Sequence, residues 1–110
     1  MGWHRNSIKW GGTVIPGVWE FGGIKFVDST KGGSVQNLNV LSSASAWQAM
    51  LEAKGWSAPA PFGAPGMTMQ ENQFGQSFVY RSGAKSFPGG TTGDLYNDGD
   101  LAAKYRFVGP

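Results

Sequence analysis

Three aspartates and two glycines lie close together in the stretch GDLYNDGD near the C-terminus. Asp94, Asp98 and Asp100 carry carboxylate oxygens, and calcium binds through oxygen ligands. The EF-hand spacing fails, because taking Gly99 as its invariant glycine puts Tyr105 where a bidentate glutamate is required. Asn and Asp before Gly instead favour a two-residue hairpin turn. We therefore predict a turn and no cofactor, with a loose calcium site at the three aspartates as the alternative.

The segment WHRNSIKW near the N-terminus interleaves two tryptophans with positively charged residues. Tryptophan stacks on bases and sugar rings, while Arg, Lys and His pair with phosphate. This segment is the best candidate for ligand binding in the sequence, and the competing interpretation is a terminal strand whose tryptophans cover an edge of the core. Its candidate residues are Trp3, His4, Arg5, Lys9 and Trp10.

An enzyme would have to work with few suitable groups. His4 is the only histidine, so histidine acid-base catalysis must use this residue. With Glu71 as a base and Arg81, Lys104 or Arg106 on phosphate, the residue types suit a metal-independent nuclease or toxin-type enzyme. Nothing in the spacing brings these residues together, and the sequence contains no GxSxG elbow, P-loop or dinucleotide fingerprint.

Composition limits the class of protein. The sequence has 110 residues, no cysteine and a formal net charge of +2. The length suits one domain, so we expect a single globular domain over 1–110. Without cysteine, disulfide scaffolds, thiol nucleophiles and cysteine-ligated zinc are excluded. The basic residues are scattered, a poor footprint for duplex nucleic acid. No run approaches about 18 apolar residues, so we predict a soluble protein without a membrane partner, in an undetermined compartment.

Short strands account for most of the chain. Many glycines lie in pairs or beside Pro, Ser, Asn and Asp, which predicts frequent tight turns. The glycine pair in VWEFGGIKFVD predicts a hairpin over 18–28. Between 101 and 108, apolar and polar residues alternate, which predicts a strand with one wet face, and a helix beginning at Asp100 is the competing interpretation. Further strands are expected at 13–15, 35–41, 67–70 and 76–81.

One segment has the pattern of a helix. Trp47, Met50 and Leu51 follow helical spacing, and Gly55 stands where a C-terminal cap is expected. The proline-rich stretch SAPAPFGAPG that follows predicts a surface loop able to act as a lid or an edge cover. The fold class is therefore α+β, with a mainly antiparallel sheet or partly open barrel and one packed helix at about residues 43–54.

This pattern favours a non-catalytic binding or interaction module that uses exposed aromatics and Gly-rich polar loops. Tryptophan and amide side chains suit a carbohydrate, and they equally suit a protein partner. Met67 and Met69 beside Phe74 form an adaptable apolar patch for a partner in one interpretation, and the two methionines fill a gap in the core in the other. The alternatives are the nuclease and a structural subunit that self-associates through a strand edge.

Overall fold

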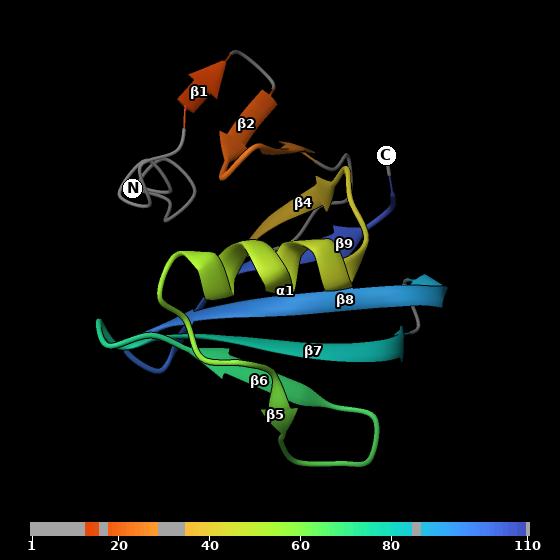
Figure 1. The fold of residues 1–110 in the computed structure, drawn as a ribbon. Helices are drawn as coiled ribbons and strands as arrows, with labels where there is room; N and C mark the ends of the chain where they lie inside the picture. Colours follow the sequence, from red (N-terminus) through yellow and green to blue (C-terminus); the bar gives the residue numbers. More distant parts are fainter. Residues whose placement is uncertain (1–12, 16–17, 29–34, 85–86, 110) are drawn as a thin grey trace.

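The computed structural model describes residues 13–15, 18–28, 35–84 and 87–109. In this part of the chain, the strands form one open sheet in the order β1-β2-β3-β4-β9-β8-β7-β6-β5 (Figure 1). Neighbouring strands are antiparallel except for β4 and β9, which run parallel. The strands are β1 (Thr13–Ile15), β2 (Val18–Phe21), β3 (Ile24–Asp28), β4 (Gln36–Val40), β5 (Ala60–Pro61), β6 (Thr68–Glu71), β7 (Gln76–Ala84), β8 (Phe87–Asn97) and β9 (Asp100–Phe107).

The single helix in the described residues, α1 (Ala44–Ala53), lies where the sequence predicts it. The Ser43 hydroxyl accepts a hydrogen bond from the Ala46 amide at 3.1 Å, which caps the first turn. At the other end, Gly55 has a φ of +97°, a conformation that glycine adopts without strain. The fold is therefore α+β with a mainly antiparallel sheet, as predicted.

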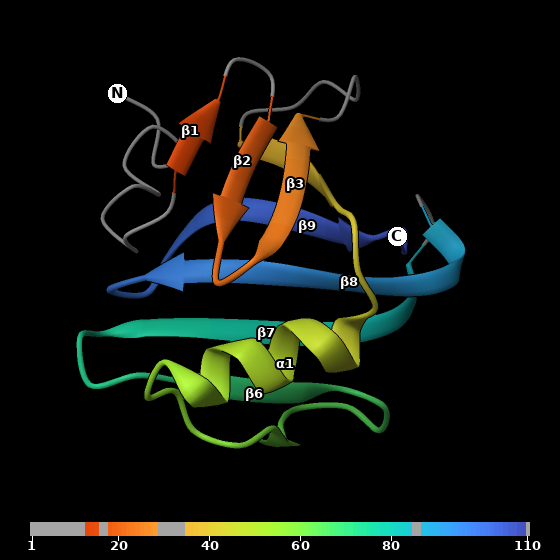
Figure 2. The same ribbon diagram turned by 45° about the horizontal axis from the view of Figure 1, so that its top comes forward.

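An aromatic cluster fills the space between α1 and the sheet. The Trp47 ring lies at its centre and is fully buried, with the ring centroids of Tyr105, Phe78 and Phe26 between 5.6 and 5.9 Å away. The sheet curls, so that β2 and β3 pass in front of β8 and β9 on the side where α1 lies (Figure 2). This curvature brings Phe21 of β2 to 6.4 Å from Trp47. The result is one core shared by the helix and the strands β2, β3, β4, β7, β8 and β9.

Two hairpin turns form at the predicted positions. Asp98 and Gly99 both have positive φ, 53° and 87°, between β8 and β9, and Gly22 and Gly23 have φ of 59° and 84° between β2 and β3. Two consecutive residues with positive φ match the twist of the flanking antiparallel strands. The stretch GDLYNDGD is thus the end of a strand and its turn, and the prediction of a final strand rather than a helix is confirmed.

The strand β8 is much longer than the sequence suggests, since it includes Pro88 and three glycines, which are residue types that disfavour strands. One of them, Gly93, is required by packing: a Cβ there would come within 2.1 Å of the Phe78 ring. The proline-rich loop also contributes a two-residue strand, β5, at the edge of the sheet. Within the described residues, no helix has both the length and the apolar character needed to cross a membrane.

Candidate functional site

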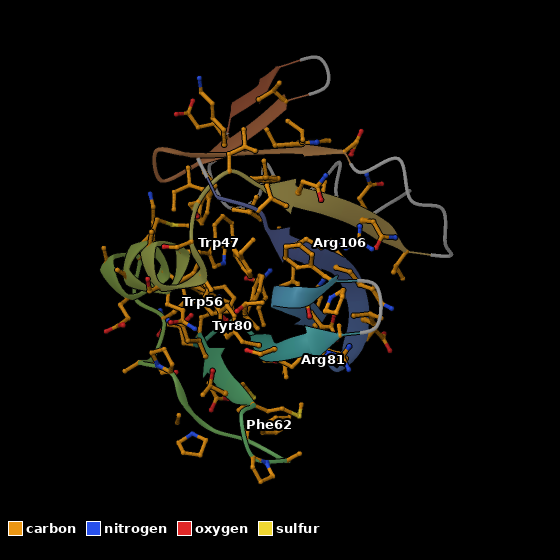
Figure 3. All side chains as sticks on the ribbon, turned by 90° about the vertical axis from the view of Figure 1, so that its right-hand side faces the viewer. Trp47, Trp56, Phe62, Tyr80, Arg81 and Arg106 are labelled. Carbon is orange, nitrogen blue, oxygen red and sulfur yellow. The ribbon has the colours of Figure 1, made fainter. Side chains whose placement is uncertain are left out.

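The sheet has two chemically different faces. Alternation along β7 directs Phe78 and Tyr80 toward α1 and places Val79 and Arg81 on the other side. In the register of the sheet, Asp94 of β8 lies between Val79 of β7 and Lys104 of β9, so these three side chains share one face. We call the side of β4 and β6–β9 turned away from α1 the outer face. In Figure 3, Trp47, Trp56 and Tyr80 lie toward the helix, while Arg81 and Arg106 lie on the opposite side.

An open pocket of about 330 Å³ lies on the outer face. Val79 forms part of its floor, and this side chain is buried although it does not belong to the core cluster under α1. One wall comes from the proline-rich loop, which is closed by a hydrogen bond of 3.1 Å from the Phe62 amide to the Met67 carbonyl. The lining residues are Phe62, Met67, Met69, Ser77, Val79, Arg81, Asp94, Tyr96 and Gly99. We call this cavity the apolar pocket.

An ion pair lies at the border of the apolar pocket. The Arg81 guanidinium donates to the Asp94 carboxylate at 2.7 Å, and the Asp94 side chain is only 8% exposed whereas that of Arg81 is 45% exposed. Burial raises the pKa of the Asp94 carboxyl above its ordinary value, and the charges of Arg81 and Lys104 offset part of this rise. Asp94 is therefore engaged in an ion pair on the sheet rather than in a turn.

A second, smaller cavity of about 50 Å³ adjoins the ion pair on the side of β9 and β4. Thr92 lies across β8 between Arg81 and Arg106 in the register of the sheet. Its hydroxyl is buried and has no hydrogen-bond partner among the residues that the structure describes. The lining residues are Asn37, Arg81, Ala84, Thr92, Asp94, Lys104, Tyr105 and Arg106. We call this cavity the polar pocket.

The structure brings together part of the predicted phosphate-contacting set. Arg81, Lys104 and Arg106 all line the polar pocket. Glu71 is exposed at the end of β6, where it pairs with Ser77, and it lines neither pocket. The remaining predicted site residues, Trp3, His4, Arg5, Lys9 and Trp10, lie outside the described residues.

The calcium alternative is not supported. Asp98 and Asp100 are exposed at the hairpin turn, whereas Asp94 is buried against Arg81. In the described part of the chain, no three His, Asp or Glu side chains gather in a way that could hold a metal ion. The acidic stretch is explained by its turn and its ion pair.

Sequence reasoning missed several residues of these pockets. Thr92 precedes Gly93 in a stretch that resembles a loop, so nothing in the sequence marked it as a buried side chain. No sequence pattern marked Phe62 and Tyr96 as neighbours either, because only the pairing of β6, β7 and β8 places them around one cavity. Alternation in β7 was a usable signal for two of the lining residues, since it separates Val79 and Arg81 from the core residues.

Comparison of the chain with protein-family models, curated proteins and solved structures finds no match. The assignment of a function therefore depends on the chemistry of the two pockets.

Proposed function

We propose that this protein is a non-catalytic binding module that takes an apolar side chain of a protein partner into the apolar pocket. The observation that carries the proposal is the cavity of about 330 Å³ on the outer face. Ligand sites typically measure about 300 to 1,000 Å³ and combine apolar walls with a few polar groups. Met67 and Met69 supply flexible, polarizable walls that adapt to different side chains, and the ion pair of Arg81 and Asp94 supplies the polar border.

The described tryptophans argue for a protein partner over a carbohydrate. Sugars stack on exposed aromatic rings, but Trp19, Trp47 and Trp56 are only 6%, 0% and 8% exposed. All three belong to the core cluster. The apolar pocket combines the aliphatic and thioether groups of Val79, Met67 and Met69 with two smaller aromatic rings, and such mixed apolar walls suit an aliphatic side chain.

One edge of the described sheet is a poor surface for self-assembly. At β5, Pro61 has no N–H to donate and Pro59 precedes the strand. Prolines and short edge strands are common devices against strand addition. The structural-subunit alternative would therefore have to use β1, at the other edge of the described sheet, and the outer face supports the binding proposal better.

Methionine methyl groups allow a direct test by NMR. We would titrate isotope-labelled protein with acetyl-Leu-Gly-Gln-amide, the glutamine peptide, and with acetyl-Gly-Gly-Gln-amide as the control. Binding in the apolar pocket should shift the methyl signals of Met67 and Met69, which line it, and leave that of Met50 in the core unchanged. Equal responses to both peptides, or no response at Met67 and Met69, would refute the proposal.

The nuclease remains a second candidate because of one observation, the gathering of Arg81, Lys104 and Arg106 around a single cavity. Phosphodiester cleavage needs a proton acceptor and a donor beside such cations. Incubation with short single-stranded RNA followed by gel electrophoresis tests this directly. The binding proposal expects intact RNA, and cleavage that is lost in His4→Ala would favour the enzyme.

A further inference from the structure

We infer that the polar pocket is a carboxylate subsite, so that the partner is an acidic peptide with an aliphatic residue near a glutamate or aspartate. This inference depends on the proposed function, since it assigns the second half of the same ligand. Arg81 and Asp94 line both pockets, so the two cavities lie next to each other at this ion pair. The apolar pocket would receive the aliphatic side chain and the polar pocket the acid.

The charges around the polar pocket favour an anion. Arg81, Lys104 and Arg106 carry three positive charges, and Asp94 is the one carboxylate in the lining. Asp94 accepts its hydrogen bond from Arg81. Within the described residues, Lys104 and Arg106 form no ion pair, because the Arg81–Asp94 contact is the only one there. Two cations therefore face this cavity with no carboxylate bound to them, and they attract an anionic ligand.

The Thr92 hydroxyl is the second, independent observation. Thr92 is only 8% exposed, lines the polar pocket, and its Oγ1 has no hydrogen-bond partner among the described residues. Buried polar groups are nearly always hydrogen-bonded, so an unpartnered hydroxyl beside cations calls for a ligand atom. The Asn37 side chain adds a donor, since its amide uses one N–H on the Val35 carbonyl at 3.1 Å and has a second.

Size and spacing favour a carboxylate on a peptide. The polar pocket has a volume of about 50 Å³, which suits a group of a few heavy atoms such as a carboxylate. Arginine recognises the two coplanar oxygens of a carboxylate with its forked donors. Val79 and Lys104 lie on β7 and β9, two strand spacings or about 10 Å apart. Side chains two residues apart in an extended peptide start about 7 Å apart. The length of a glutamate side chain spans the remaining distance to the polar pocket.

The test compares the glutamine peptide with acetyl-Leu-Gly-Glu-amide, the glutamate peptide, which differs by one charge. The glutamate peptide should bind about tenfold more tightly at low salt, because it gains charge-assisted hydrogen bonds. The preference should shrink as ionic strength rises. Arg106→Gln and Thr92→Val should each reduce the preference for glutamate, and the Thr92 amide should shift in the unmodified protein. The matched control is Lys25→Gln, which removes the same charge from a residue that lines neither pocket.

Four results decide between the two proposals. Tighter binding of the glutamate peptide, lost in Arg106→Gln and kept in Lys25→Gln, supports the carboxylate subsite. Equal affinities for the two peptides, with Met67 and Met69 still shifted, overturn the subsite and leave the proposed function standing. If neither peptide shifts those methyl groups, the proposed function fails, and acetate alone then tests the subsite at the Thr92 amide. Inorganic phosphate that binds more tightly than acetate would overturn the carboxylate assignment and indicate a phosphorylated ligand.

Discussion

Two buried polar groups on opposite faces of the sheet, Gln70 and Thr92, differ in their hydrogen bonding. On the helix side, Gln70 is fully buried, and its amide donates to the Gln48 and Ser57 carbonyls at 3.1 and 3.0 Å while its oxygen accepts from the Tyr80 hydroxyl at 2.5 Å. On the outer face, the Thr92 hydroxyl has no partner among the described residues. A buried network in which every polar group is hydrogen-bonded stabilises a fold. A buried polar group without a partner lowers stability until a ligand atom forms a hydrogen bond with it. This difference is consistent with our proposal that the helix side stabilises the fold and that the outer face binds a ligand.

The largest effect is expected at the centre of the helix-side core. Trp47→Ala should lower the free energy of unfolding by about 3 to 5 kcal/mol, because it leaves a cavity inside a packed aromatic cluster. Met69→Ala, at a half-buried position on the outer face, should cost about 1 kcal/mol. Urea unfolding followed by circular dichroism measures both values. Similar losses of unfolding free energy at the two positions would contradict the claim that the helix side contributes more to stability than the outer face does.

The next effect concerns the buried hydrogen-bond network. Tyr80→Phe removes only the hydroxyl that donates to Gln70, so it should destabilise the fold by about 1 to 3 kcal/mol. Burial raises the pKa of the Tyr80 hydroxyl well above its ordinary value, so the group keeps its proton in alkaline solution as well as at neutral pH. Tyr96→Phe, in the wall of the apolar pocket, is the matched control and should change stability by less than about 0.5 kcal/mol.

On the outer face, removal of a hydroxyl should stabilise the fold instead of destabilising it. Thr92→Val replaces an unpartnered buried hydroxyl by a methyl group of similar size, so it should raise the free energy of unfolding by about 1 kcal/mol. The measurement is urea unfolding in a buffer without carboxylates or phosphate. A destabilised variant would mean that the hydroxyl already has a structural role.

The smallest effect is a dependence of stability on pH. The pKa of Asp94 is higher in the folded protein than its ordinary value, so the folded state holds this proton more tightly than the unfolded chain does. The favourable contribution is complete below the ordinary carboxyl range and is lost as pH rises through the folded pKa of Asp94. Asp94→Asn should remove this part of the pH dependence, as measured by thermal unfolding across that range. An unchanged dependence of stability on pH in Asp94→Asn would contradict the assignment of this dependence to Asp94.

Local patterns were enough to predict much of the fold. Trp47, Met50 and Leu51 repeat at helical spacing, and the turns at Gly22 and Asp98 depend on the φ values that adjacent residues accept. These features need no information from distant residues. The strand over 87–94 could not be predicted in this way. Pro88 and the glycines disfavour a strand locally, and only pairing with β7 and β9 imposes one.

The candidate site was harder to predict, since it depends on register between strands. Arg81, Lys104 and Arg106 were identified by residue type, and Met67 and Met69 as an adaptable patch. Their grouping required β7, β8 and β9 to align Val79, Asp94 and Lys104 in one row. A shift of one residue would turn these side chains toward the core. Sequence alone therefore supplied the chemistry but not the two pockets.

The most direct test is the affinity of Met69→Gln for the glutamine peptide, measured beside its stability. The substitution keeps the length of the side chain and adds polarity to a wall of the apolar pocket. We expect a free energy of unfolding within about 1 kcal/mol of the unmodified protein and a loss of affinity of at least about tenfold. Unchanged affinity in a folded variant would contradict the claim that the outer face is the binding surface.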